Sequence, residues 1–383
     1  MSLEQRSQTM LAGAAAPRPP FRADHVGSIL RSAALKEARA QCSRGMLAAA
    51  QLKEIEDREI AAIIRRQEDI GLKLATDGEY RRQVWSIDFL QHLIGVESYM
   101  AKEGVQFSGG VKSTPKTARI VGRIDFRDHP MIEHFRFLKA HTHVAAKMTI
   151  PSPTVLHFRI GRGAISRDIY PDLAVLFDDL ANAYRKAIGA FYDAGCRYLQ
   201  LDDTVWAYLC SDVEREKCRA RGDDPDKLPD IYARMIDRAI GDRPKDMFLT
   251  THLCRGNFRS SSISEGGYEP IAEMLLGALP YDGYFLEYDT ARAGGFEPLR
   301  FLPAGNKRVV LGLVSSKFGA LESADDIKRR IDAAGKYVDL DQLCLSPQCG
   351  FASTEEGNIL AEDEQWAKLR LIVEIARDVW GSP

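Results

Sequence analysis

Several features of other protein classes are missing from this sequence of 383 residues. No apolar run approaches the roughly 18 residues that a membrane helix needs, so we expect no membrane span. Neither sign of charge is in excess, because 52 Lys and Arg residues stand against 54 Asp and Glu residues. This balance argues against a nucleic-acid binder that relies on bulk positive charge. Glycine pairs at 266–267 and 294–295 lack the spacing and the following Lys-Ser/Thr of a phosphate loop.

The cysteines also lack a pattern, since the seven of them are dispersed with no regular disulfide spacing. A reduced, cytoplasmic setting is therefore expected. The apolar stretch at 10–16 is too short for a signal core and runs into three prolines. We expect residues 1–20 to be a disordered leader and residues 21–383 to form a single domain.

What the sequence does contain is a series of short apolar runs that end in polar residues. Eight such runs lie at Ala23–Leu30, Leu72–Asp77, Val144–Ile150, Tyr198–Asp202, Met247–Cys254, Gly283–Glu287, Val309–Ser315 and Leu343–Ser346. Between most of them apolar residues recur every three or four positions, as in 180–191 and 369–379, which indicates helices. Strands that alternate with helices form a parallel sheet with right-handed crossovers. Eight units predict an α/β fold of the (β/α)8 TIM-barrel type.

Two intervals between the runs are longer than one barrel unit needs. Residues 95–142 contain turn residues and a candidate strand at 119–124, and we expect an inserted arm between strands two and three. This arm could close over the barrel mouth or join two copies as a homodimer. Residues 211–230 are heavily charged and are expected to form an exposed excursion.

Metal-binding side chains stand at the ends of three runs. His252 and Cys254 are two residues apart on one strand end and should therefore point to the same side. Glu287 ends the sixth run, and Cys349 follows the eighth. In barrels of this kind the active site lies at the carboxyl ends of the strands. One imidazole, two thiols and one carboxylate at this rim are ligands that suit Zn²⁺.

Each of these residues also has an ordinary structural interpretation. The His-x-Cys pair could be a packed strand end, Cys349 a small buried hydrophobe, and Glu287 an ion-pair partner. Their conjunction at strand ends favours the zinc site, and the other five cysteines are expected to be structural. His141 and His143 also form a metal-binding pattern, but they precede a strand and so lie at the wrong end of the barrel.

Six short strings together resemble the catalytic barrel of the cobalamin-independent methionine synthase family, over about residues 21–380. They are A-D-H-V-G-S, T-D-G-E-Y-R-R, T-H-L-C-R-G-N, F-L-E-Y-D, G-L-V-S-S-K and L-S-P-Q-C-G-F. The resemblance implies zinc-dependent transfer of a methyl or alkyl group from a small-molecule donor to a small-molecule thiol. Full-length members have a duplicated architecture about twice as long, and the first half is missing here.

The resemblance also implies roles for individual residues. His252, Cys254, Glu287 and Cys349 occupy the zinc-ligand positions of the family. Asp202 matches the acidic residue that holds the amino group of homocysteine, and Gly27-Ser28 match the loop that meets the carboxylate. Glu79 keeps the Gly-Glu pair of the family. Tyr288 and Asp289 are candidates for orienting a metal ligand.

Other positions depart from the family pattern. Arg81 stands where the family has a carboxylate that contacts the amine, and a cation there would attract a carboxylate, sulfonate or phosphate instead. Lys317 takes the place of a histidine proposed as an acid. The tryptophan that stacks the pterin has no clear equivalent, because the segment offers His157, Phe158 and Arg159.

These departures leave several interpretations open. His25 could be an acid or a substrate contact, or an ordinary rim histidine, and Arg82 could replace Arg81 at the mouth. The main hypothesis is a methyltransferase similar to the homocysteine enzymes. Alternatives are an alkyltransferase that uses an anionic thiol without an amine, as in epoxide opening, a lyase like the porphyrinogen decarboxylases, and a non-catalytic zinc or thiol sensor.

Overall fold

The computed structural model describes residues 18–101, 105–106, 110, 112–113 and 116–383. The expected leader therefore lies outside the described residues up to position 17. Within the described part of the chain, no helix is long and apolar enough to cross a membrane. All seven cysteines are free thiols.

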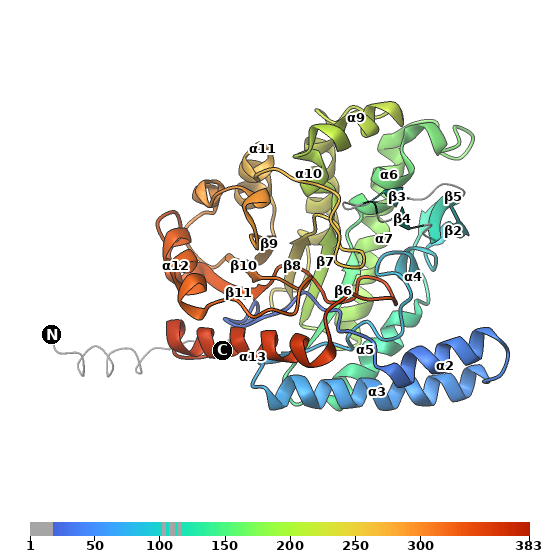
Figure 1. The fold of residues 1–383 in the computed structure, drawn as a ribbon. Coiled ribbons are helices and arrows are strands. Elements are labelled where there is room, and N and C mark those ends of the chain that lie inside the picture. Colours follow the sequence, from blue (N-terminus) through green and yellow to red (C-terminus); the bar gives the residue numbers. More distant parts are fainter. Residues whose placement is uncertain (1–17, 102–104, 107–109, 111, 114–115) are drawn as a thin grey trace.

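A curled parallel sheet forms the centre of the fold, as predicted, and within the described residues it has seven strands where the eight apolar runs predicted eight (Figure 1). Its strands follow one another in chain order as β1 (Leu74–Ala75), β6 (Ala145–Pro151), β7 (Tyr198–Asp203), β8 (Phe248–Leu253), β9 (Gly283–Glu287), β10 (Arg308–Val314) and β11 (Leu343–Pro347). Nearly every residue of β7 to β11 is buried, which is typical of parallel strands covered on both faces.

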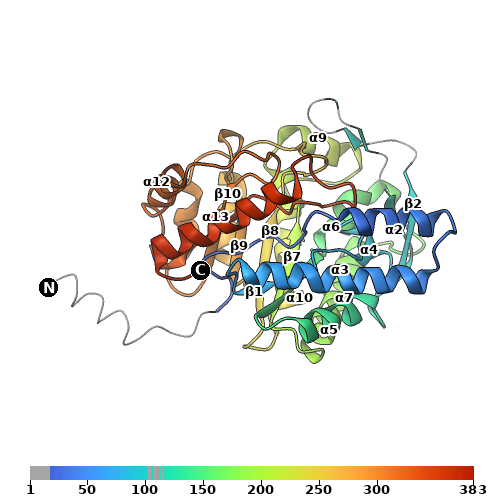
Figure 2. The ribbon, with the colours of Figure 1, turned by 60° about the horizontal axis from the view of Figure 1, so that its bottom comes forward.

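Helices surround this sheet. They are α2 (Ala33–Ser43), α3 (Ala49–Asp69), α4 (Ile87–Leu90), α5 (Pro130–His141), α6 (Thr154–Ile160), α7 (Leu173–Asp193), α8 (Val205–Leu209), α9 (Asp212–Ala220), α10 (Leu228–Ile240), α11 (Glu269–Ala272), α12 (Ala324–Ala334) and α13 (Glu362–Trp380). Helix α7 illustrates how the sequence determines where a helix begins and which side is buried. Asp172 caps its first turn, and apolar residues at three- and four-residue steps face the core. Figure 2 shows α3 and α13 lying across the outside of the strands.

The first apolar run differs from expectation, because most of Ala23–Leu30 is not a regular strand. Only Ala23 forms a bridge, which is parallel and pairs it with Leu345 of β11. The chain then bends, and Gly27 has a φ of +146°. Apolar composition cannot reveal such a bend. Its consequence is that residues 25–28 are carried away from the ladder and toward the strand ends.

A buried polar network fixes this bend. Lys147 on β6 donates to Asp24 Oδ1 at 2.9 Å and to the carbonyl oxygen of His25 at 2.6 Å. Tyr198 donates its hydroxyl to Asp24 Oδ2 at 2.8 Å. All three side chains are at most 1% exposed, so the ion pair is shielded from solvent and its partners are tightly positioned. The barrel interior thereby anchors the segment that leads to Gly27.

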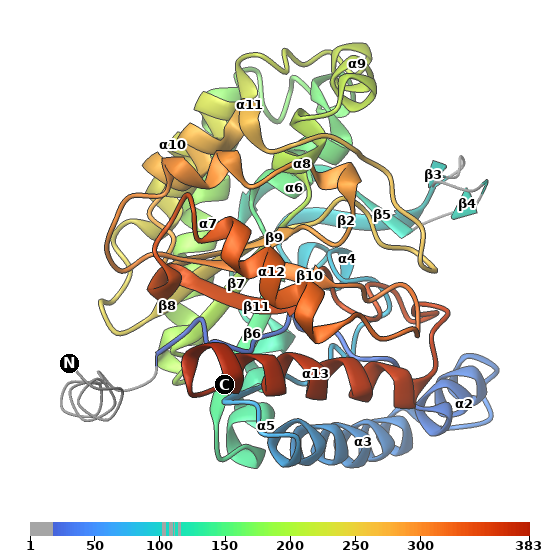
Figure 3. The ribbon, with the colours of Figure 1, turned by 60° about the vertical axis from the view of Figure 1, so that its left-hand side comes forward.

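The expected arm is an antiparallel hairpin of β2 (Ile94–Met100) and β5 (Lys116–Asp125). A second small pair, β3 (Val105–Gln106) and β4 (Lys112–Ser113), extends from it, away from the barrel (Figure 3). Arg123 on β5 pairs with Asp179 of α7 at 2.8 Å, which ties the hairpin to the helical layer.

Candidate metal centre

Four potential metal ligands converge at the carboxyl ends of three strands. His252 lies on β8, Cys254 follows it directly, Glu287 is the last residue of β9, and Cys349 lies two residues beyond β11. Each offers one ligand atom, and these atoms all lie within 4.8 Å of one another. The Sγ atoms of the two cysteines are 3.5 Å apart. All four residues are buried, as a closed ligand set requires.

The residues present fit a tetrahedral zinc ion. Bonds of about 2.0–2.3 Å place the donors about 3.3–3.8 Å apart; the two Sγ atoms, 3.5 Å apart, have this spacing, and the whole set lies within 4.8 Å. Neither ring nitrogen of His252 bonds to an oxygen or nitrogen atom of the described residues, although the side chain is only 2% exposed, and the group it interacts with is Cys349, another member of the cluster. A buried imidazole without a partner is unfavourable, and a metal bond would satisfy it.

Both oxygens of the Glu287 carboxylate also bind groups of the protein. Oε1 accepts from the backbone N–H of Arg255 at 2.8 Å, and Oε2 accepts from Arg292 Nη2 at 2.8 Å. Arg292 also pairs with Asp289 at 3.1 Å. Burial and the neighbouring Cys349 raise the pKa of Glu287, although Lys317 and Arg292 oppose the rise. Glu287 is therefore oriented by its surroundings rather than by the cluster alone.

The two thiols differ in acidity. Their hydrogen bond lowers the pKa of Cys349, and His252 and Lys317 add to this lowering. The same contact and burial raise the pKa of Cys254. Lys317, which contributes to the lowered pKa of Cys349, is 5% exposed, and its Nζ lies 3.4 Å from the carbonyl oxygen of Gly256. A positive charge thus stands beside the thiols, where it favours the thiolate.

Two further carboxylates face the same region. Glu79 has a φ of 59°, and its Oε1 accepts from Thr149 Oγ1 at 3.1 Å. Asp202, at the end of β7, accepts from Gln200 Nε2 at 2.7 Å and lies in register with His252 on β8. Burial raises the pKa of Asp202 to about 7, and the nearby Glu79 adds to the rise. The pair could hold one positively charged group.

The Gly27-Ser28 segment lies between this carboxylate pair and the Cys349 loop. A Cβ on Gly27 would stand 2.7 Å from Thr149 Cγ2 and 3.4 Å from Glu79 Oε1, so the backbone approaches both closely. Ser28 accepts at its hydroxyl from the N–H of Ala352 at 3.2 Å. The expected substrate loop and the expected metal ligands are therefore neighbours.

Arg81 does not lie where the sequence analysis placed it. Its guanidinium pairs with Glu56 at 3.2 Å and with Asp57, both on α3, and lies over the ring of Phe137. Arg82 is the arginine that turns inward: its Nη1 is 3.7 Å from Glu79 Oε2, and it donates to the carbonyl oxygen of Thr149. Two α3 carboxylates, some 25 positions away in sequence, decide the direction of Arg81.

His25 is also directed away from the cluster. Its Nε2 bonds to Gln67 Oε1 at 2.9 Å on α3, and the side chain is 1% exposed. Burial, with Lys147 nearby, lowers its pKa to about 3, so the ring stays neutral. The interpretation of an ordinary buried histidine fits these contacts. His141 is exposed on α5, in accord with its exclusion from the site.

Sequence reasoning missed several residues around the cluster. Arg292 lies in a 3₁₀ turn at Ala291–Ala293, and Tyr208 lies on the short helix α8. Trp85 follows β1 and lies under the guanidinium of Arg159. The only signal that could have found them is their position shortly after a strand end, which many surface residues share.

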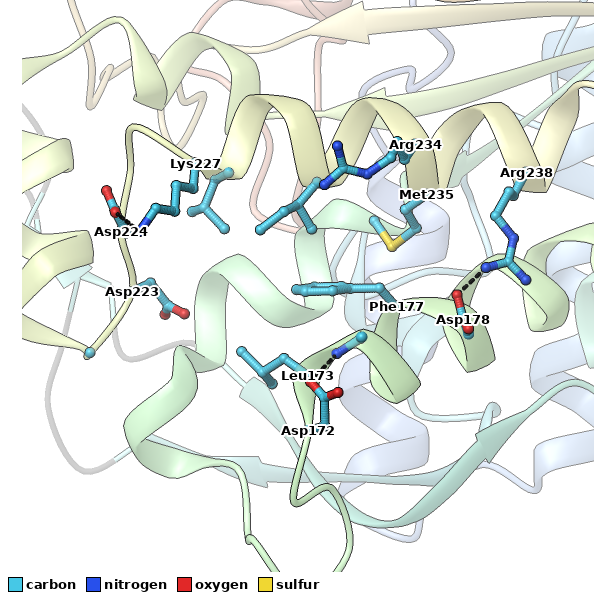
Figure 4. Close-up of a pocket in the computed structure, with 14 residues that line it drawn as sticks. Asp172, Leu173, Phe177, Asp178, Asp223, Asp224, Lys227, Arg234, Met235 and Arg238 are labelled. Carbon is cyan, nitrogen blue, oxygen red and sulfur yellow. Dashed lines mark hydrogen bonds and ion pairs between the residues drawn. The ribbon is translucent and has the colours of Figure 1, made fainter.

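A separate groove lies on the outside of the barrel between α7 and α10, with a volume of about 540 Å³. Figure 4 shows Phe177 of α7 and Met235 of α10 pointing toward each other between the two helices, and the Asp178–Arg238 ion pair at one end. None of the residues that line it belongs to the metal cluster or to the loop at Gly27. It therefore gives no access to the candidate centre.

The sequence and the fold are similar to those of known proteins. The family model described as the catalytic domain of cobalamin-independent synthase matches residues 21–378. The YxjH protein of Bacillus subtilis (strain 168) is 52% identical over 364 residues, which are 95% of this chain and 96% of that protein. A crystal structure of a candidate vitamin-B12-independent methionine synthase from Listeria monocytogenes is 46% identical, covers 95% of this chain and 99% of its own, and has a TM-score of 0.77.

A more distant relative carries an activity in its name. The 5-methyltetrahydropteroyltriglutamate–homocysteine methyltransferase of Synechococcus sp. is 23% identical over 338 residues, 87% of this chain. The match covers 40% of that enzyme, so this chain corresponds to less than half of its length.

Proposed function

The chain belongs to the cobalamin-independent synthase catalytic-domain family, and on that premise we propose that it is a zinc-dependent transferase that moves a methyl or other alkyl group to a thiol. Methyltransferases of this family, such as the Synechococcus enzyme, support the reaction class. Residues 21–383 would act as one catalytic unit. The observation that carries the proposal is the convergence of His252, Cys254, Glu287 and Cys349.

A zinc ion on these ligands would take up the acceptor thiol as its thiolate, which is a far better nucleophile than the thiol, whose ordinary pKa is about 8.5. Two cysteine thiolates and the Glu287 carboxylate carry one negative charge more than Zn²⁺ supplies. Such an electron-rich set should leave the incoming sulfur nucleophilic. Lys317 would limit the build-up of negative charge beside Cys349.

The carboxylates near the cluster support an acceptor that carries an amine. Glu79 and Asp202 are buried and face the same region, and an ammonium group would offset the cost of keeping them charged there. The backbone of Gly27-Ser28 would meet the carboxylate of the same amino acid. Because Arg81 points to α3, the argument for an anionic thiol without an amine loses its main residue. An amino-acid thiol of the homocysteine type is therefore the preferred acceptor.

The lyase and sensor alternatives differ in what they require. A lyase of the porphyrinogen decarboxylase type would need no metal and would stay active after zinc removal. A sensor would bind thiols without transfer. Four buried donors of suitable chemistry favour the zinc-dependent reaction over the lyase.

Proton release during binding tests the proposal directly. Because a coordinated thiol loses its proton, binding of homocysteine to the zinc-loaded protein at pH 7 should release about one proton per thiol. Calorimetry in buffers of different ionisation enthalpy measures this number, and Cys349→Ser and metal-free protein serve as controls. Binding without proton release, or equal release from the metal-free protein, would contradict the proposal.

A further inference from the structure

Cations without carboxylate partners surround the candidate metal centre. Within the described part of the chain, Arg159, Arg255 and Lys317 form no ion pair with an acidic side chain, although most arginines of the protein do. Each interacts electrostatically with one residue of the cluster: Arg159 with Cys254, Arg255 with Glu287, and Lys317 with Cys349. A cation that has no acidic partner in the protein can pair with a negatively charged group of a ligand.

The three cations are not equally accessible. Arg255 is completely buried, its guanidinium nitrogens have no hydrogen-bond partner, and it lies 4.3 Å from the ring centre of Tyr268. No substrate can reach it without a rearrangement, so its charge offsets Glu287. Lys317 is 5% exposed and lies against Gly256. Arg159 is the partly exposed member of the three.

The surroundings of Arg159 form one wall of the site. It lies near the end of α6, the helix that follows β6 at the carboxyl end of the barrel. Its guanidinium carbon is 5.4 Å from the ring centre of the partly exposed Trp85. Tyr208 on α8 is the other neighbour, and both Tyr208 and Arg159 interact electrostatically with Cys254. Arg159 and Tyr208 therefore lie within electrostatic range of the metal cluster.

Arg159 lacks a partner that would satisfy its charge. Its interactions within the described residues are the contact with Trp85 and the electrostatic interactions with Tyr208 and Cys254. Burial lowers its pKa, and Tyr208 and Cys254 only partly oppose this. By contrast, its neighbour His157 is occupied on both nitrogens, by Tyr232 at 2.7 Å and by Asp223 at 3.3 Å.

We propose that Arg159, held over Trp85, binds an anionic oxygen group, such as a carboxylate, sulfonate or phosphate, on one of the two substrates. This inference rests on the proposed function, because it assigns a specificity-determining residue to the same site. A planar guanidinium offers two parallel N–H donors to such a group, and the indole holds that plane in place. The anionic group belongs to the acceptor thiol or to the alkyl donor.

Binding measurements without turnover separate these two sources. Zinc-loaded wild type, Arg159→Gln and Arg159→Lys are titrated by calorimetry with 3-mercaptopropionate, with cysteamine, and with 5-methyltetrahydropteroyltriglutamate. Arg159→Gln should weaken one of the two anionic probes about 10- to 100-fold. Arg159→Lys should restore part of the affinity, and cysteamine, which has no anionic oxygen, should bind as to wild type.

The outcomes identify the substrate or overturn the inference. Selective loss of 3-mercaptopropionate assigns Arg159 to the acceptor, and selective loss of the triglutamate assigns it to the donor. Unchanged affinity for both anionic probes would overturn the assignment, as would an equal loss of cysteamine, which indicates a structural role. Arg197→Gln is the matched control, because Arg197 lies 3.8 Å from the ring centre of Tyr192 at the other end of the barrel.

The proposed function and this inference can fail separately. If the wild-type protein holds no zinc, the proposed transferase is wrong, yet the triglutamate titration still tests Arg159 on the metal-free protein. If zinc is bound and Arg159→Gln holds it equally well but shows no change for either anion, only the assignment of Arg159 is wrong.

Discussion

The Sγ atoms of Cys254 and Cys349 lie 3.5 Å apart although 95 residues separate them in the chain. No disulfide joins them. Their approach is a consequence of barrel geometry, because β8 and β11 present their carboxyl ends to the same rim. His252 and Glu287 complete the group from β8 and β9. One ion bound here would therefore link the ends of β8, β9 and β11, which are far apart in sequence.

Replacement of Cys349 by serine should release the metal. The hydroxyl is a poor zinc ligand, so the zinc content should fall from about one ion per chain to a small fraction of this. Atomic emission on the purified variant measures the ratio. Cys344→Ser is the matched control, since Cys344 is a buried thiol on β11, the strand that leads to Cys349, and lies outside the cluster. Full zinc occupancy together with full activity in Cys349→Ser would show that the ligand assignment is wrong.

Arg292→Gln should weaken zinc binding without abolishing it. Arg292 donates to Glu287 Oε2 at 2.8 Å and holds Asp289 as well, so the variant loses the group that orients the carboxylate. Loss of such an outer contact typically lowers metal affinity about 10- to 100-fold. Competition with a chromophoric chelator measures the dissociation constant. Arg300→Gln, which removes an exposed ion pair with Glu269 and local contacts with Glu297 and Phe301 outside the cluster, should leave the dissociation constant unchanged; an equal effect of both variants would contradict a role for Arg292.

The metal cluster is the part of the site that sequence could predict. The two-residue period of a strand places His252 and Cys254 on one side, and the barrel brings the ends of β9 and β11 to the same rim. These inferences use regular geometry alone. The fold could be predicted for the same reason, since β7 to β11 fall within or close to the apolar runs.

The directions of the other side chains around the site depend on tertiary contacts, which the spacing of residues in the sequence does not reveal. Arg81 and Arg82 follow β1 in a turn where Glu79 has a positive φ, so alternation no longer fixes direction there. Glu56 and Asp57 on α3 then draw Arg81 outward. Arg292 lies in a turn after β9, where backbone direction depends on local packing. Sequence reasoning therefore located residues at or just beyond strand ends, and it did not fix the direction of side chains farther along the turns.

The buried His25 should make stability depend on pH. Its pKa is lowered to about 3 by burial and Lys147, whereas the unfolded chain binds a proton near pH 6.5. Between these values the unfolded state holds the extra proton, so stability falls as the pH falls below 6.5. In His25→Gln this contribution is absent, and the free energy of unfolding should fall about 1.4 kcal/mol less per pH unit.

Urea unfolding at several pH values in this window measures the difference in slope. His141→Gln is the control, because His141 is exposed and should leave the slope as in wild type. Burial also lowers the pKa of His129, to about 4, and this residue contributes equally to the pH dependence of stability in all three proteins. Parallel slopes for wild type and His25→Gln would show that His25 is protonated in the folded state.

Gly27→Ala should destabilise the protein and disturb the substrate loop. The residue has a φ of +146°, and a Cβ would stand 2.7 Å from Thr149 Cγ2, so both backbone strain and a steric contact oppose the change. We expect a loss of about 1–3 kcal/mol in the free energy of unfolding. Gly45→Ala separates the two effects, because Gly45 has a φ of +71° but nothing within 4 Å of the added Cβ.

The double variant Gly27→Ala/Thr149→Ser tests the contact itself. Serine lacks the methyl group at the point of closest approach, so the double variant should recover the steric part of the loss and keep the backbone part. The Gly27-Ser28 backbone would meet the carboxylate of the acceptor, a group that cysteamine lacks, so Gly27→Ala should also weaken homocysteine binding more than cysteamine binding. Unfolding in urea and thiol titration of the zinc-loaded variants measure the two effects. If Thr149→Ser recovers nothing, the approach of Gly27 to Thr149 does not require glycine.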